Sequence, residues 1–221
     1  MKKVAIIYTV RPVLNTFPEL LQEVVGEKLK IFNLLDDFLA SDPGESGIFS
    51  IENHNRLFND LKSCELTGAD LIVVTCSTLT PAVQRIRPFI RVPIVAIDDA
   101  MTEQAVRIGQ KIKVIATAMS TIKPTVAKLQ QEARKAGVSV SIDAQDNETA
   151  YAAMKRGDQA THDKLVLEHI ATVQGYDCIV LAQASMGHLQ PEAEKLAAIP
   201  VLASPRLCCE QVKQLLMKEK I

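Results

Sequence analysis

An internal repeat at an offset of about 107 residues constrains the fold of this chain more than any other feature. Gly175-Tyr-Asp-Cys-Ile-Val-Leu181 aligns with Gly68-Ala-Asp-Leu-Ile-Val-Val74, and Ile199-Pro-Val201 aligns with Val92-Pro-Ile94 at the same shift. Almost the same shift places Val114-Ile-Ala-Thr117 over Ile6-Ile-Tyr-Thr9. Because structural repeats keep a constant period along a chain, three matches in one order indicate two similar halves.

Each half alternates strand-like apolar runs with amphipathic, helix-like segments. Strands are expected at residues 4–10, 28–34, 71–75, 92–97, 113–117, 138–142, 177–181 and 201–202. Helices are expected at 17–25, 51–66, 80–87, 99–108, 120–136, 148–155, 158–174, 189–198 and 205–218, with 35–50 irregular. Such alternation predicts an α/β fold of two pseudo-symmetric lobes, each a mostly parallel sheet flanked by helices. The first lobe is expected to comprise 1–98 plus 203–221 with a closing C-terminal helix, the second 99–202, and the active site the cleft between them.

Composition excludes several classes of protein. The 221 residues are 48% hydrophobic and 23% charged, with a formal net charge of −1, as in a soluble globular protein. The absence of a basic cluster and of tryptophan argues against a nucleic-acid partner. The apolar runs have strand length, so no membrane partner is expected, and the N-terminus is interpreted as a first strand rather than a signal peptide. Five cysteines without CxxC spacing favour reduced thiols in a cytoplasmic protein, and four histidines without zinc-site spacing predict no metal.

The strand Leu71–Val74 ends in a cluster of small reactive residues, Thr75-Cys-Ser-Thr78, and Pro81 suits the first turn of a helix. Open α/β sheets bind ligands at the carboxyl ends of such buried strands. The start of a helix also offers N–H groups to an anion and favours the thiolate form of a cysteine. The alternative is that Cys76 is a buried structural residue; its place at a strand end favours a functional role.

Polar residues also follow the other strands that should meet at the cleft. A serine or threonine there is often only a helix N-cap, yet together they form a set of small donors suited to a compact carboxylate. The four segments supply Thr9 and Asn15; Cys76, Ser77 and Thr78; Thr117, Ser120 and Thr121; and Gln183, Ala184 and Ser185. Arg11 is the one cation in these segments, which favours a monocarboxylate or an uncharged side group over aspartate. Neither a GxGxxG nor a P-loop pattern is present, so no cofactor is expected.

These segments resemble the aspartate/glutamate/hydantoin racemase superfamily, which also includes arylmalonate decarboxylase and maleate isomerase. Val73-Val-Thr-Cys-Ser-Thr78 resembles the family's first "CNT" motif, with Ser77 in place of asparagine. Ile179-Val-Leu-Ala-Gln-Ala-Ser-Met186 resembles its second "GCT" or "GCA" motif, and Thr117-Ala-Met-Ser-Thr121 is similar to its carboxylate-binding hydroxyl cluster. The resemblance covers essentially the whole chain. It implies a cofactor-independent isomerase that acts on a small carboxylate (amino-acid, hydantoin or malonate-like) and that forms a dimer.

One departure from the family bears on mechanism. The racemases of the family use one cysteine from each lobe, whereas the repeat places Gln183 opposite Cys76. An amide cannot serve as a general acid or base near neutral pH. Cys76 alone, as thiolate base or nucleophile, suits decarboxylation with one-sided protonation or cis–trans isomerisation through a covalent adduct. Racemisation requires a substitute acid, for which the candidate is His188, five residues after Gln183.

The other cysteines and histidines are assigned structural or solvated positions. Cys178 is expected to pack in the core, and Cys208 and Cys209 on the closing helix are expected to be structural rather than catalytic. His54, His162 and His169 are expected to lie solvated on polar helix faces. A second interpretation is a catalytically silent protein of the same fold that binds a small carboxylate, with Gln183 holding the ligand. A sugar-binding or flavodoxin-like two-lobe protein is a third interpretation, which would need aromatic or acidic lining.

Overall fold

Four parallel strands form the sheet of the first structural unit. In the computed structural model, which describes residues 1–218, they are β1 (Lys3–Tyr8), β2 (Lys30–Leu35), β3 (Leu71–Val74) and β4 (Ile94–Ala96). Their order in the sheet is β2-β1-β3-β4. The two central strands, β1 and β3, are almost wholly buried because their apolar side chains pack on both faces of the sheet.

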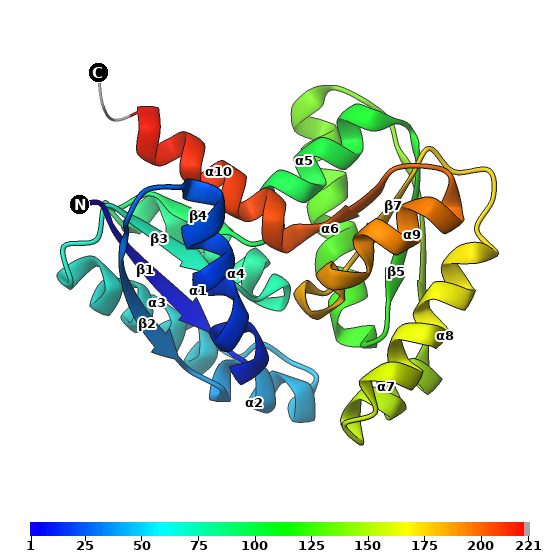
Figure 1. Cartoon of the computed structure of the whole chain (residues 1–221). Coiled ribbons are helices and arrows are strands. Elements are labelled where there is room, and N and C mark those ends of the chain that lie inside the picture. The colour runs from blue at the N-terminus through cyan, green and yellow to red at the C-terminus, as the bar shows by residue number, and fades with distance from the viewer. Residues whose placement is uncertain (219–221) are drawn as a thin grey trace. The chain divides into compact units, whose positions relative to one another are not determined.

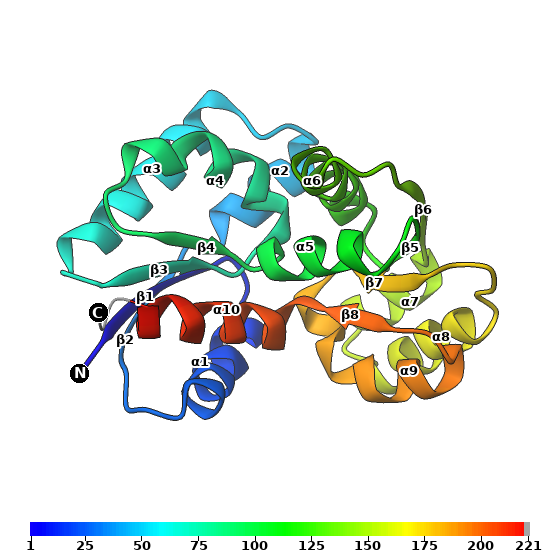
Figure 2. The same cartoon turned by 90° about the horizontal axis from the view of Figure 1, so that it is seen from above.

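Helices cover both faces of this sheet (Figure 1, Figure 2). One face packs against α2 (Phe38–Ser46), α3 (Ile51–Leu66) and α4 (Thr80–Ile86), in a core that joins Ile7 and Ile72 to Leu57. The other face is covered by α1 (Arg11–Val25) and by α10 (Ser204–Lys218), which returns from the far end of the chain. Lys213 Nζ of α10 donates to the Val24 carbonyl of α1 at 2.9 Å. Two short 3-10 segments, η1 (Ser77–Leu79) and η2 (Arg87–Phe89), flank α4.

The second unit repeats the same sheet. Its strands are β5 (Lys111–Ala116), β6 (Ser141–Asp146), β7 (Cys178–Leu181) and β8 (Val201–Ala203), in the order β6-β5-β7-β8. One face packs against α7 (Glu148–Lys155), α8 (Gln159–Ala171) and α9 (Gln190–Ala197), and the other carries α5 (Asp99–Ile108) and α6 (Met119–Ala136). The 3-10 segment η3 (Ala184–Leu189) follows β7. Contacts group residues 1–99 and 205–218 in the first unit, and Ala100–Ser204 in the second.

The internal repeat holds for individual hydrogen bonds. Asp70 N donates to Lys3 O at 2.8 Å, and Asp177 N donates to Lys111 O at the same distance. The side chain of each aspartate also accepts a hydrogen bond from the same lysine: Asp70 Oδ2 from Lys3 N at 2.7 Å, and Asp177 Oδ2 from Lys111 N at 2.8 Å. The predicted architecture, two parallel sheets flanked by helices, is confirmed.

Three predicted elements differ from the structure. Residues 35–50 contain α2, which was predicted to be a loop because it includes Pro43 and Gly44. Helix α1 begins at Arg11 rather than at residue 17, because Pro12 lies in its first turn, where a missing N–H costs nothing. Strand β6 spans Ser141–Asp146 and so lies later than the predicted 138–142. Among the helices of residues 1–218, none combines the length and the apolar character needed to cross a membrane.

Candidate functional site

Cys76 lies at the carboxyl end of β3, where the chain leaves the sheet and enters η1. Its backbone is extended, with φ −123° and ψ 115°. The side chain is half-buried, whereas the other four cysteines of the described chain are buried. Cys76 Sγ lies 2.9 Å from Thr78 Oγ1, and either atom can donate to the other. Ser77 and Thr78 are also half-buried, so this segment presents a thiol and two hydroxyls at the edge of the first sheet.

The four buried cysteines belong to the core, as predicted for Cys178, and the burial of Cys208 and Cys209 is consistent with the structural role expected for them. Burial raises the pKa of Cys64 and of Cys178 to about 11, and it raises the pKa of Cys209 to about 12. Cys208 is also fully buried, and its pKa is raised well above the ordinary value. Since low dielectric disfavours the thiolate, these four side chains stay protonated at neutral pH.

The neighbouring strand ends of the first sheet bring buried polar groups to the same edge. Thr9, after β1, is buried, and Thr75 Oγ1 donates to Ile7 O at 3.0 Å. Thr80 Oγ1 donates to Asp98 Oδ1 at 2.6 Å, and Asp98 is fully buried two residues after the end of β4. Sequence reasoning missed Asp98; its signal was a carboxylate immediately following the strand predicted at 92–97. Asn15, by contrast, is exposed on the second turn of α1 and not in a loop after β1, because that helix starts early.

A charged cluster that sequence reasoning also missed surrounds the end of β2. Asp36 is buried there and accepts a hydrogen bond from Arg56 Nε of α3. The guanidinium of Arg56 lies 5.0 Å from the ring centre of Phe38. One turn further along α3, burial together with the neighbouring Asp36 raises the pKa of Asp60 to about 7. Arg56 is therefore a cation at this edge in addition to Arg11, already engaged by a carboxylate.

Gln183 takes the place in the second sheet that Cys76 has in the first. Its backbone is likewise extended, with φ −129° and ψ 132°. Leu79 N donates to Cys76 O at 3.1 Å, and Met186 N donates to Gln183 O at 3.0 Å. The two residues are thus equivalent in backbone conformation and bonding, as the repeat predicts.

The side-chain oxygen of Gln183 is held by three donors from the turn between β5 and α6. Gln183 Oε1 accepts from Thr117 N at 2.5 Å, from Thr117 Oγ1 at 3.0 Å and from Ala118 N at 3.0 Å. Thr121 Oγ1 donates to Ala118 O at 2.8 Å. The hydroxyls of Thr117 and Thr121 are therefore bonded to the protein itself. The remaining predicted residues of this unit, Ser120, Ala184 and Ser185, are exposed, half-buried and exposed, respectively.

His188 lies at the end of η3 with 42% of its side chain exposed. Its Nδ1 donates to Ser185 O at 3.0 Å, and its Nε2 lies 2.8 Å from Asp163 Oδ2 of α8. His162 Nδ1 contacts the other Asp163 oxygen at 2.7 Å. Although burial acts to raise it, these bonds from His188 and His162 hold the pKa of Asp163 below its ordinary value. His162 is completely buried, so the prediction of a solvated side chain was wrong for this residue.

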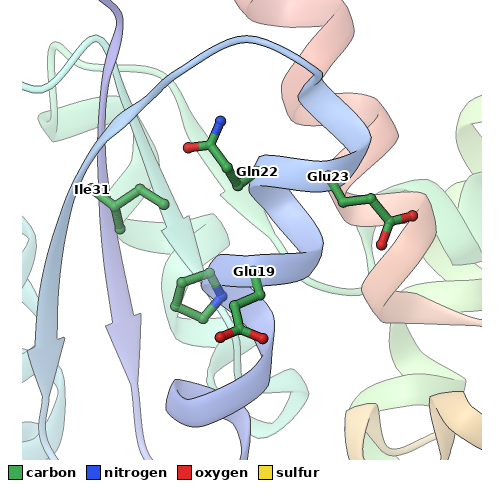
Figure 3. Close-up of a pocket in the computed structure, with 5 residues that line it drawn as sticks. Glu19, Gln22, Glu23 and Ile31 are labelled. Atoms are coloured by element: carbon green, nitrogen blue, oxygen red, sulfur yellow. The ribbon is translucent and has the colours of Figure 1, made fainter.

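A shallow pocket on the first unit contains none of the predicted residues. Figure 3 shows Glu19, Gln22 and Glu23 of α1 beside Ile31, near the amino end of β2; Pro18 completes the lining. This pocket is therefore at the opposite end of β2 from Asp36. Within residues 1–218, no three histidine, cysteine or acidic side chains are grouped so that they could hold a metal ion.

Comparison with known proteins agrees with this architecture. A family model described as Asp/Glu/hydantoin racemase matches residues 42–212. None of the curated proteins matches the chain. Among solved structures, glutamate racemase isoform RacE1 from Bacillus anthracis is 14% identical with a TM-score of 0.73, over 100% of this chain and 83% of that one. A putative Asp/Glu racemase from Yersinia pestis is 18% identical with a TM-score of 0.73, over 98% and 100% of the two chains. The allantoin racemase from Klebsiella pneumoniae is 16% identical with a TM-score of 0.67, over 99% and 89%.

Proposed function

Because this chain belongs to the Asp/Glu/hydantoin racemase family, we propose that it is a cofactor-independent enzyme of isomerase type that acts on a small carboxylate. Cys76 is the proposed thiolate base or nucleophile. The observation that carries this proposal is the contrast among the five cysteines. Four are buried in hydrocarbon, and Cys76 alone is partly open, at the carboxyl end of a buried parallel strand.

The groups beside Cys76 suit this role. A hydroxyl that donates to a sulfur anion stabilises it, and Thr78 Oγ1 is 2.9 Å from Sγ. Ser77, Thr78 and Thr9 are proposed to hold the substrate carboxylate from the first unit. As a base, Cys76 takes the α-proton and leaves an enolate. As a nucleophile it adds to a carbon–carbon double bond, and elimination after rotation returns the thiolate.

Gln183 limits which reactions this enzyme can perform. An amide neither takes nor gives a proton near neutral pH, so proton transfer is proposed to be one-sided, through Cys76. Decarboxylation fits that limit if Cys76 is then in its thiol form: CO2 leaves, the thiol protonates the resulting enolate, and water reprotonates the sulfur. Cis–trans isomerisation through the thiolate adduct also fits. Racemisation requires His188 as acid, and His188 would first have to release Ser185 O or Asp163. That one substrate contacts Cys76, Gln183 and His188 stays a prediction, as do a homodimer and a cytoplasmic location.

The substrate class is proposed as amino-acid, hydantoin or malonate-like. The solved structures of similar fold carry the names of glutamate, aspartate and allantoin racemases, which span amino acids and a hydantoin. Thermal-shift screening with malonates, maleate, hydantoins and amino acids tests this class, because a ligand that binds the native state raises the melting temperature. A shift of several degrees with one class would identify the substrate type.

Replacing the thiol tests the mechanism. Cys76→Ala is expected to lower turnover of the compound found in the screen by roughly a thousandfold or more, because covalent or general-base chemistry is lost. Since the Cys76 side chain is only half-buried, the melting temperature of the Cys76→Ala variant should stay within about 2 °C of that of the wild-type protein. Thr78→Val, which removes only the neighbouring hydroxyl, is the matched control and should keep partial turnover. Unchanged turnover in Cys76→Ala would eliminate this mechanism.

The locked amide of Gln183 supports a second candidate function, a catalytically silent protein that binds a small carboxylate. Here Gln183 holds the ligand and Cys76 is only a contact. The two candidates differ in one measurable outcome. If the protein only binds its ligand, the wild-type protein and the Cys76→Ala variant should bind a compound from the screen with equal affinity, and neither should convert it.

A further inference from the structure

We propose that Gln183 is a ligand-binding residue whose amide is fixed in one direction, so that Nε2 donates to an oxygen of the bound carboxylate. Its Oε1 belongs to the protein and its Nε2 to the ligand. This inference rests on the proposed function in one respect, the carboxylate as ligand class. It adds the atom that recognises the carboxylate and withdraws Thr117 from direct contact with it.

The direction of the amide follows from the three donors around Oε1. Two are backbone N–H groups and one is a hydroxyl, at 2.5–3.0 Å. Thr117 is 1% exposed, so these donors have no solvent to turn to. Flipping the amide would direct Nε2 at the two N–H groups and leave them unpaired in the interior, which is unfavourable. The orientation is therefore set by the fold.

The nitrogen of the same amide is available to a ligand. Among residues 1–218, Gln183 Nε2 has no hydrogen-bond partner, and it is not among the buried side-chain atoms that lack one. Because the residue is half-buried, Nε2 offers its two N–H groups to solvent or to a ligand. Hydrogen bonds to Oε1 also polarise the amide and strengthen donation from its nitrogen.

The position of Gln183 supports a ligand role independently of its bonds. It is the backbone equivalent of Cys76, the one cysteine that is not buried in the described chain. Both stand at the carboxyl end of the third strand of a parallel sheet, where α/β proteins bind ligands. An N–H donor there fits a carboxylate or enolate oxygen and not an ammonium group. Gln183 donates a hydrogen bond and transfers no proton.

Consequently, Thr117 and Ala118 act on the ligand only through Gln183. They are positioning residues, because every donor they direct toward Gln183 ends on Oε1. The sequence had suggested that Thr117 itself holds the carboxylate. The structure assigns that contact to Gln183 instead.

Gln183→Glu separates the two ends of the amide. The carboxylate keeps an acceptor for the three donors but puts an oxygen anion where Nε2 was. The melting temperature should stay within about 2 °C of wild type, while malonate affinity, measured by calorimetry, should fall at least tenfold. Gln183→Met removes donor and acceptor without adding charge. It should lower both the melting temperature and the affinity, the latter by roughly 10- to 100-fold, the usual cost of a lost hydrogen bond to a charged group.

Thr117→Val is the matched control. It removes one of the three donors to Oε1 and keeps the two backbone donors and Nε2. It should lower the melting temperature and change malonate affinity less than threefold. Wild-type affinity in Gln183→Glu, or an affinity loss in Thr117→Val as large as in Gln183→Met, would overturn the assignment.

These binding measurements are independent of turnover, so the two proposals fail separately. If malonate binds and Gln183→Glu abolishes binding while Cys76→Ala keeps full turnover, only the thiolate mechanism fails. If Gln183→Glu binds malonate like wild type while Cys76→Ala is inactive, only the Gln183 assignment fails. If none of the malonates, maleate, hydantoins and amino acids of the screen binds the wild-type protein, both proposals fail, because both require a ligand of this class.

Discussion

Cys76 and Gln183 occupy equivalent backbone positions, two residues beyond the end of β3 and of β7. Their backbones are similar to within about 20° in both dihedral angles. What differs is the group that each side chain meets. Cys76 Sγ meets one hydroxyl, that of Thr78, whereas Gln183 Oε1 meets three donors. One of the two positions is thus suited to a reactive group and the other to a fixed one.

Asp60 predicts a pH-dependent stability at the residue scale. Its pKa is raised from 3.8 to about 7 in the folded protein, first by burial and then by Asp36. The folded state therefore binds a proton more tightly than the unfolded state, and stability falls as pH rises from about 4 to about 7. Asp60→Asn should remove this loss, so its urea midpoint should exceed that of wild type at pH 8 by more than at pH 4.

The comparison across pH contains its own control, because the variant is measured against wild type under both conditions. If the difference in urea midpoint between Asp60→Asn and wild type were the same at pH 4 and pH 8, Asp60 would have the same pKa in the folded and unfolded states, and the raised pKa would be refuted.

Residue types could be predicted at strand ends, but their partners could not. The sequence alone located Cys76 and Gln183, because each follows an apolar run of strand length. The Gln183 amide is fixed by hydrogen bonds from Thr117, which lies 66 residues away, and no local sequence pattern predicts this contact. Arg56 was hidden for a similar reason: it joins the edge from α3, through Asp36, 20 residues before it.

At the scale of elements, the turn between α5 and β5 depends on a glycine. A Cβ on Gly109 would lie 2.2 Å from Asp177 Cβ, and Asp177 cannot easily move because its Oδ2 accepts from Gln110 N and Lys111 N. Gly109→Ala should therefore lower the free energy of unfolding by roughly 1–3 kcal/mol. Urea denaturation measures this change.

Gly44 offers the matched control. A Cβ there meets nothing within 4 Å, and the residue lies inside α2. Gly44→Ala should be neutral or stabilising by up to about 1 kcal/mol, since alanine favours a helix over glycine. Equal urea midpoints for Gly109→Ala and Gly44→Ala would show that the turn tolerates a side chain.

Elements were predictable where one signal dominated. Buried central strands such as β3 and β7 are continuous apolar runs, and both were placed correctly to within a residue. The start of α1 and the whole of α2 were not, since proline and glycine within a helix have the same signature as a loop. Packing of Leu39 into the core stabilises α2 despite that composition.

At the scale of the whole molecule, each unit has its own core, and local damage should stay local. Asp70 and Asp177 make the same backbone contact in their respective units. Asp70→Ala should speed amide hydrogen exchange in residues 1–99 and 205–218, and Asp177→Ala in residues 100–204, because cooperative units open separately. Each variant is the control for the other. Faster exchange throughout 1–218 in both would mean that the two cores unfold as one.

Helix α10 brings the last part of the described chain back to the first unit, after the whole second unit has intervened. Its Cys209, Val212 and Leu216 are buried, and its Lys213 Nζ donates to the Val24 carbonyl of α1, 189 positions earlier in the chain. During synthesis, the whole second unit is therefore complete before α10, which belongs to the first unit, has been made. During translation, the apolar surface of the first unit that α10 covers stays exposed to solvent until that helix has been made, and exposed apolar surface of this kind favours aggregation.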